Sequence, residues 1–233
     1  MAHAYRLAVR IGECLDSGDT PFVLGGDCSI LIAVGLAVSR RGRFGLVHLD
    51  GHTDFRHPGN SDACGSLAGE DLAAAVGLHW DAVADIERRR PYFHPNDSVH
   101  AGCRSNDEHL DEASKTLALT ITAPHVRERG PEAVATTILE VLARRPVSGF
   151  WIHLDLDILD PTVMSSVDSP DPDGLFAEEL SALLSVLVPR ASGADVTIFD
   201  PDLDPDGTDA QLLTDLLAAS FGRLGSTIPR APG

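Results

Sequence analysis

Short runs of apolar residues alternate along this chain with longer stretches in which apolar positions recur at helical spacing. Fully apolar runs are typical of buried strands, and recurrence every three to four residues is typical of helices that cover a core. The pattern predicts strands at 22–24, 44–49, 98–102, 117–121, within 149–161 and at 196–199. It predicts its main helices at 2–15, 30–38, 72–78, 131–143, 177–187 and 210–221.

Strands that alternate with helices imply right-handed crossovers and a mostly parallel sheet. We therefore expect an α/β fold, a three-layer sandwich with a sheet of about six strands, in which residues 1–233 form one domain. The carboxyl ends of parallel strands meet at one edge of such a sheet, where ligands usually bind.

The segment 149–161 ends its apolar run with three aspartates, Asp155, Asp157 and Asp160. Residues two apart on a strand point to the same side, so we expect Asp155 and Asp157 to present their carboxylates together. Two such carboxylates repel each other, so a cation must lie between them or one of them must hold a proton. Asp160 precedes a proline, and we expect it to shape the turn that leaves the strand.

Two other predicted strand ends carry polar side chains that could join this site. Asp50, His52 and Asp54 follow the second strand at a spacing of two, which would direct all three into one site while strand geometry lasts. Cys28 follows two glycines after the first strand, at a switch from strand to helix where α/β sheets present ligand groups.

Four carboxylates and one imidazole are too many groups for a pair that simply shares a proton. Divalent cations would neutralise them, and an oxygen-rich set with an imidazole favours Mn²⁺, Fe²⁺ or Zn²⁺ over Ca²⁺. Bridging carboxylates can hold two ions roughly 3.5–4 Å apart with a hydroxide between them, which provides a nucleophile near neutral pH. An isolated pair of aspartates is more often a solvated turn, but two such motifs after apolar strands favour a metal site. The residues predict metal-assisted hydrolysis and leave the substrate open.

Composition narrows the class of partner. A formal net charge of −17 argues against a protein that follows nucleic-acid phosphates, so a small ligand or a cation fits better. The four cysteines lack the spacing of a structural zinc site or a disulfide scaffold. Because no apolar run is long enough to span a membrane and no signal peptide is evident, we expect a cytoplasmic protein.

Three motifs resemble, in order and approximate spacing, the signatures of the ureohydrolase family, which includes arginase, agmatinase and formimidoylglutamase. They are GGDCS at Gly25–Ser29, DGHTD at Asp50–Asp54 and HLDLDILDP at His153–Pro161. The resemblance implies an arginase-like fold and a binuclear manganese hydrolase that attacks a guanidino or amidine carbon of a small molecule.

By matching position, the resemblance also implies roles for individual side chains. The implied metal ligands are Cys28, Asp50, His52, Asp54, Asp155 and Asp157. Asp50 and Asp155 would bridge the two ions, Asp54 and Cys28 would complete the shell of one, and His52 and Asp157 that of the other. Asp54 and Asp107 are the expected catalytic residues, because Asp107 matches an acid that family members use near the substrate amine.

Four positions depart from the family pattern. Cys28 replaces the usual histidine, and a thiolate favours Zn²⁺ or Fe²⁺ more than histidine does. Ala68 replaces a proton-shuttling histidine, and Arg56 replaces an asparagine that arginases use for the amino-acid end. Ile198 replaces the glutamate that binds the guanidinium group in arginase. Because an apolar residue cannot pair with a buried cation, we expect ordinary guanidinium recognition to be weakened.

The resemblance has a consequence for the sheet as well. Family members generally have a longer segment before the first motif, which supplies two further strands of an eight-stranded sheet, whereas 24 residues precede Gly25 here. We therefore expect those first family strands to be missing and 22–24 to form an edge. Unpaired edges invite association, so the N-terminal helix or a second copy of the chain is expected to cover it.

Three functions stay open on the sequence. The first is an arginase-like hydrolase of a less basic guanidino analogue, such as an N-hydroxyguanidine or an amidine, which would not need the missing acid. Family members with cysteine at the position of Cys28 include ones that resemble hydroxyarginine hydrolases, which supports this choice. The second is a catalytically silent metal-binding or assembly protein on the same fold, motivated by the departures above. The third, a two-metal phosphatase or nuclease, suits the carboxylates but lacks a basic cluster near the motifs.

Overall fold

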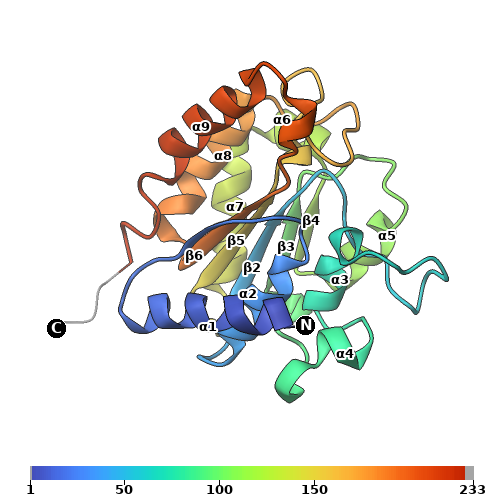
Figure 1. The fold of residues 1–233 in the computed structure, drawn as a ribbon, viewed down its shortest axis with the longest axis vertical. Coiled ribbons are helices and arrows are strands. Elements are labelled where there is room, and N and C mark those ends of the chain that lie inside the picture. Colours follow the sequence, from blue (N-terminus) through green and yellow to red (C-terminus); the bar gives the residue numbers. More distant parts are fainter. Residues whose placement is uncertain (1, 229–233) are drawn as a thin grey trace.

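A single parallel sheet forms the centre of the computed structural model, which describes residues 2–228 (Figure 1). Its strand order is β1-β6-β5-β2-β3-β4, and every neighbouring pair is parallel. The strands are β1 (Phe22–Leu24), β2 (Gly45–Leu49), β3 (Ser98–Ala101), β4 (Leu119–Ile121), β5 (Phe150–Asp155) and β6 (Gly193–Thr197). The predicted α/β class and the number of strands are confirmed.

Helices cover both faces of the sheet (Figure 1). On one face lie α1 (Ala2–Asp16), α2 (Ile30–Ser39), α3 (Asp71–Ala75), α4 (Asp81–Ala84) and α5 (Leu110–Thr116). On the other lie α6 (Ala123–Arg129), α7 (Pro131–Ala143), α8 (Ala177–Leu187) and α9 (Thr208–Phe221). Side chains of the central strands alternate between two apolar cores. On β5, for example, Ile152 and Leu154 pack towards α7 and α8, whereas Trp151 packs towards α2.

The last strand lies earlier in the chain than its apolar run predicted. β6 pairs with β5 from Trp151↔Gly193 to Asp155↔Thr197, so Ile198 and Phe199 come after the strand. Gly193 is needed there because a Cβ at that position would collide with the Trp151 ring. The expected strand at 196–199 was therefore wrong in its bounds, since packing against a tryptophan admits a glycine that strand propensity disfavours.

The edge strand β1 is paired on one side only within the described part of the chain. It bonds to β6, and the Phe22 ring lies 4.8 Å from the Phe221 ring. Helix α1 packs mainly against α2 and leaves the Leu24 side chain 68% exposed. The N-terminal helix therefore does not cover the edge at Leu24, and cover by a second copy of the chain, the other alternative, stays a prediction.

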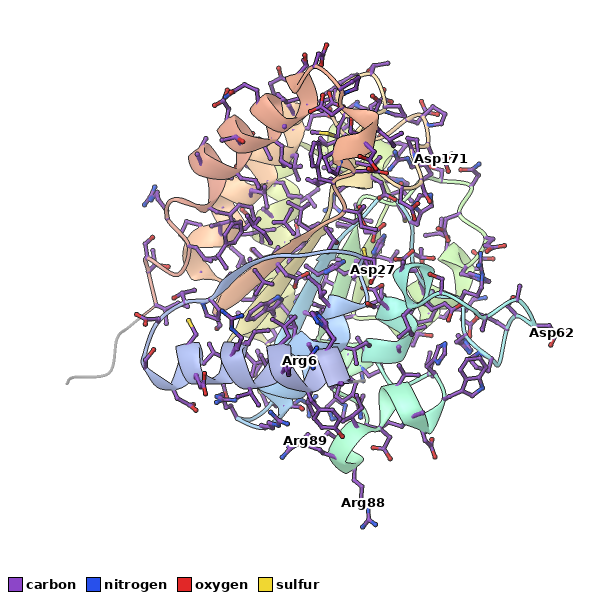
Figure 2. All side chains as sticks on the ribbon, in the orientation of Figure 1. Arg6, Asp27, Asp62, Arg88, Arg89 and Asp171 are labelled. Atoms are coloured by element: carbon purple, nitrogen blue, oxygen red, sulfur yellow. The ribbon has the colours of Figure 1, made fainter. Side chains whose placement is uncertain are left out.

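Charged side chains lie mostly at the periphery, as Asp62 on a long loop and Arg88 below α4 illustrate in Figure 2. Between residues 2 and 228 no helix has the length and apolar character needed to cross a membrane.

Candidate metal centre

Three loops at the carboxyl edge of the sheet bring the predicted ligands together. Cys28, in the loop between β1 and α2, donates from Sγ to Asp155 Oδ2 at 2.6 Å. His52, in the loop after β2, has its Nδ1 2.8 Å from Asp157 Oδ2. The site is therefore assembled from β1, β2 and β5, which are not all neighbours in the sheet.

The loop after β2 converges for a different reason than the one expected. β2 ends at Leu49, and Asp54 has a φ of 46°, so the spacing of two no longer describes a strand there. Instead, Asp50 Oδ1 accepts the His52 N–H at 2.6 Å, which folds the chain back on itself. A tight turn, and not strand alternation, directs Asp50, His52 and Asp54 into one site.

The turn after β5 also replaces the expected strand geometry. The strand ends at Asp155, residues Leu156–Ile158 form a 3-10 turn, and Asp157 N–H donates to Asp155 Oδ1 at 2.9 Å. Asp157 Oδ1 in turn accepts the Gly51 N–H at 2.9 Å, which ties the two loops together. The prediction that strand alternation aligns Asp155 and Asp157 was thus wrong in mechanism.

Asp160 shapes the chain that leaves this turn. Its Oδ1 accepts hydrogen bonds from Thr162 N at 3.0 Å and from Thr162 Oγ1 at 2.6 Å, and its Oδ2 accepts from Asp173 N. The predicted turn role is confirmed.

Burial and mutual repulsion make negative charge costly on the carboxylates of the centre. Burial and the charge of Asp54 raise the pKa of Asp50 well above its usual range, and burial and nearby acids do the same for Asp54. Burial and the Asp157 charge raise the pKa of Asp155 to about 7. The hydrogen bond to Asp157 raises the pKa of His52 to about 9, although burial opposes it. The site therefore takes up protons or cations.

A divalent ion fits this donor set. Sγ of Cys28 and a carboxylate oxygen each from Asp50 and Asp54 lie within 4.8 Å of one another. Asp50 Oδ2 is buried and has no hydrogen-bond partner, which leaves it free to bind an ion. Burial followed by the Asp155 charge raises the pKa of the Cys28 thiol well above its usual value, so a bound metal would have to displace that proton.

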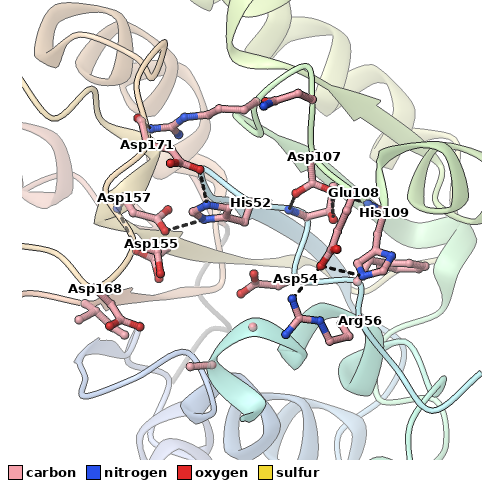
Figure 3. Close-up of a pocket in the computed structure, with 18 residues that line it drawn as sticks. His52, Asp54, Arg56, Asp107, Glu108, His109, Asp155, Asp157, Asp168 and Asp171 are labelled. Carbon is pink, nitrogen blue, oxygen red and sulfur yellow. Dashed lines mark hydrogen bonds and ion pairs between the residues drawn. The ribbon is translucent and has the colours of Figure 1, made fainter. Parts of the chain in front are cut away.

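A pocket of about 360 Å³ opens above these groups (Figure 3). Its floor includes His52, Asp54, Asp155 and Asp157, whereas Cys28 and Asp50 lie buried beneath. Ala68 and Ile198, two of the positions that depart from the family pattern, are both in its wall. The departures therefore bear directly on what the pocket can hold.

Asp107 lies in the wall but its oxygens are occupied. They accept hydrogen bonds from Thr53 N at 2.9 Å, from Thr53 Oγ1 at 2.6 Å and from His109 N at 2.9 Å. Asp107 thus holds Thr53, the residue that precedes Asp54, and its expected catalytic role stays a prediction.

Two arginines line the pocket, Arg56 and Arg104. Arg56 pairs with Glu108 at 2.7 Å, and Glu108 also lies 3.2 Å from His109 Nε2 (Figure 3). The buried Arg104 donates from Nη2 to the carbonyls of Leu159 and Asp171. Because Asp171 lies 3.3 Å from His52 Nε2, Arg104 steadies a loop that contacts the site. No spacing in the sequence marks Arg104 or Asp171 for this role.

Comparisons with known proteins agree with this architecture. The chain is 29% identical to the arginase of Bacillus caldovelox over 221 residues, 93% of this chain and 73% of that protein. It is 26% identical to the N(omega)-hydroxy-L-arginine amidinohydrolase of Streptomyces lavendulae over 213 residues, 90% of this chain and 72% of that protein. The crystal structure of the Bacillus caldovelox arginase superposes with a TM-score of 0.85 at 29% identity, over 94% of this chain and 74% of that one. The profile of the Arginase family matches residues 3–222, and this chain belongs to that family.

Proposed function

We propose that this chain is a metal-dependent hydrolase of a guanidino or amidine C–N bond in a small molecule. The observation that carries the proposal is the convergence of six donor side chains at or beneath the floor of a pocket: Cys28, Asp50, His52, Asp54, Asp155 and Asp157. The named arginase and amidinohydrolase relatives support the reaction class.

These six residues would hold two divalent ions. Mn²⁺ suits the oxygen-rich set, and the Cys28 thiolate would also suit Zn²⁺ or Fe²⁺. Ions bound there would supply the positive charge that makes water a nucleophile near neutral pH.

The chain's own residues would orient the substrate and move protons. In the ion-free protein the pKa of Asp54, at the pocket floor, lies well above its usual range, so binding of an ion there would release a proton. Asp107 keeps Asp54 in place through Thr53, and Asp171 holds the His52 ring at Nε2, which would leave His52 Nδ1 and Asp157 to bind an ion. Those groups that do not contact an ion therefore act by fixing the ones that do.

The pocket wall favours a substrate that is less basic than arginine. Ile198 offers no charge to a guanidinium group, and Arg56 is already paired with Glu108. A guanidinium group beside Ile198 loses hydration there without gaining an ion pair, whereas an N-hydroxyguanidine, which is a weaker base, loses less. We propose such an analogue as the substrate class.

The test is turnover by purified protein that has been stripped of metal and reloaded with Mn²⁺, Zn²⁺ or Fe²⁺. Arginine, agmatine, N-hydroxyarginine and formimidoylglutamate are assayed by release of urea, hydroxyurea or formamide. We expect N-hydroxyarginine to be hydrolysed with a higher kcat/KM than arginine. Two bound ions without turnover of any of the four compounds would contradict the proposal and point to a silent metal-binding protein.

A matched pair of variants separates catalysis from folding. Asp54→Asn keeps the shape of the pocket floor but removes an anionic donor, and we expect it to lower kcat by about 100-fold or more. The exposed loop residue Asp62 provides the control, because Asp62→Asn changes the net charge equally at a position outside the pocket.

A further inference from the structure

Three histidines lie side by side behind the metal centre, and the proposed hydrolysis uses none of them. His48 on β2 pairs in register with His100 on β3 and with His153 on β5. All three are fully buried on the face that α1–α5 cover, and the rings of His48 and His153 stack with centroids 4.8 Å apart. Three buried imidazoles call for polar partners, because burying an unpaired polar atom is costly.

The Nδ1 atoms of these rings have such partners. His153 Nδ1 lies 2.5 Å from Asp195 Oδ2, and Asp195 Oδ1 accepts the Trp151 Nε1–H at 2.5 Å. Since a carboxylate accepts, His153 carries its hydrogen on Nδ1. His48 Nδ1 lies 3.0 Å from His100 Nδ1, so one of these two rings donates to the other. A histidine held by a carboxylate at Nδ1 is the usual arrangement of a metal ligand that binds through Nε2.

The opposite nitrogens have no such partners. Nε2 of His48 and Nε2 of His153 make no hydrogen bond, and neither do Oδ1 and Oδ2 of the buried Asp71 or Oδ2 of Asp50. These five atoms face one another. His48 Nε2 lies 3.5 Å from Asp71 Oδ1 and 3.7 Å from Asp50 Oδ2, and His153 Nε2 lies 3.5 Å from Asp71 Oδ2. Each separation exceeds a good hydrogen bond between nitrogen and oxygen.

Those separations match the spacing of ligands around one metal ion. Zn²⁺ binds imidazole nitrogen and carboxylate oxygen at about 2.0–2.2 Å, which sets neighbouring tetrahedral donor atoms roughly 3.3–3.6 Å apart. Donor atoms of His48, Asp50 and His153 lie within 4.8 Å of one another, and so do those of Cys28, Asp71 and His153. We propose that His48, His153, Asp71 and Asp50 bind a third divalent cation, of the Zn²⁺ type, beneath the two ions of the hydrolytic centre.

Charge supports a third ion. Beside Cys28, five carboxylates meet at this edge of the sheet: Asp50, Asp54, Asp71, Asp155 and Asp157. Two divalent ions balance four negative charges, and a deeper ion would balance the remainder. Asp50 would contact both sites, through Oδ2 to the deep ion and through Oδ1 to the side on which His52 lies. The deep ion would therefore hold Asp50 in place without touching the substrate.

Crystals of the metal-stripped protein reloaded with Zn²⁺ test the proposal directly, by anomalous diffraction at the zinc edge. We expect a peak about 2.0–2.2 Å from Nε2 of both His48 and His153, and about three zinc ions per chain by elemental analysis. Density that stays empty between these two nitrogens at full occupancy of the other ions would overturn the proposal. In that case Asp71 accepts hydrogen bonds from the imidazoles instead.

Variants supply a second readout that does not depend on activity. Asp71→Ala removes two of the five donor atoms, and we expect it to bind one zinc ion fewer than the unmodified chain. His57→Gln is the control, because His57 is also buried, but its Nε2 is already bonded to Glu112 at 3.0 Å. Equal zinc content in Asp71→Ala and the unmodified chain would contradict a deep site. If Asp71→Ala does not fold, diffraction from the unmodified protein decides the question alone.

The deep metal site and the hydrolytic function can be disproved independently of each other. A chain that hydrolyses its substrate with two ions and an empty deep position would retain the function and lose the inference. A zinc peak at His48 and His153 in a chain without turnover would support the deep site and contradict the hydrolytic function.

Discussion

At the residue scale, Ile198 places an uncharged side chain in the wall of the pocket. Ile198→Glu would place a carboxylate among the lining residues, where it can accept charge-assisted hydrogen bonds from a guanidinium group. We expect kcat/KM for arginine, relative to N-hydroxyarginine, to rise about tenfold or more, mainly through a lower KM. Ile198→Gln introduces a side chain of nearly the same shape as glutamate but without its charge. An equal shift in both variants would show that polarity or size, and not charge, controls the preference.

We expect Asp107 to affect both stability and catalysis, because it accepts two hydrogen bonds from Thr53. Asp107→Asn keeps one acceptor oxygen and replaces the other by an NH₂ group, so one of the hydrogen bonds to Thr53 is lost. We expect a loss of about 1–2 kcal/mol in the free energy of unfolding, and a fall in kcat larger than the change in KM. Denaturant titration and steady-state kinetics measure the two effects. Glu108→Gln, at the neighbouring wall position, should leave unfolding nearly unchanged.

Only some of the site residues can be predicted from the sequence. Cys28, Asp50, His52, Asp54, Asp155 and Asp157 follow apolar strands within dense motifs, so their convergence can be predicted from the chain alone. Asp71 and Arg104 carry no such signal, because each enters the site through packing of distant segments. His48, His100 and His153 do carry a sequence signal, because each is a polar residue within an apolar strand and faces the same core.

At the element scale, Gly102 marks where β3 must pass close to the turns that carry the ligands. Its φ is +118°, and a Cβ there would collide with the Ile158 side chain and lie 2.8 Å from the Asp50 carbonyl oxygen. We expect Gly102→Ala to destabilise the fold by about 3 kcal/mol or more and to weaken metal binding, since both turns must move. Thermal unfolding and metal titration provide the measurements.

Gly130 is the matched control for that substitution. It also has a positive φ, of 85°, but nothing lies within 4 Å of a Cβ built on it. Gly130→Ala should therefore show backbone strain alone, about 1–3 kcal/mol at φ 85° and ψ 129°, with unchanged metal affinity. Similar losses in the two variants would mean that close packing at Gly102 contributes little.

Long elements were predictable and short ones were not. The periodic apolar stripes at 131–143 and 177–187 gave the bounds of α7 and α8, since burial of one helix face alone decides them. The short helices α4, α5 and α6 went unpredicted because four to seven residues hold too few apolar positions to show a period. The turns after β2 and β5 were missed because side chains, through Asp50 and Asp155, fold the backbone there.

At the scale of the whole molecule, removal of metal should make stability depend on pH. In the metal-free protein, burial and the Asp157 charge raise the pKa of Asp155 to about 7, from an ordinary value of 3.8. A carboxyl with a raised pKa in the folded state contributes stability that is complete below its unfolded pKa and is lost as pH rises through its folded pKa. We expect the Tm of chelated protein, relative to that of metal-loaded protein, to fall as the pH rises from the unfolded pKa of 3.8 to the folded pKa of about 7. Parallel curves with and without metal would contradict this.

The exposed edge of the sheet at β1 offers a surface for association between copies of the chain. We propose that two copies of the chain meet at β1, because this strand pairs only with β6 among the described residues and leaves Leu24 68% and Phe22 39% exposed. Leu24→Lys would place like charges on the apposed edges, so we expect the dimer to dissociate at least about tenfold more readily in sedimentation velocity or light scattering. Leu78→Lys changes another partly exposed leucine, 36% exposed between α3 and α4, and should leave association unchanged. A monomer at all concentrations for the unmodified chain, or equal effects of the two substitutions, would refute association through β1.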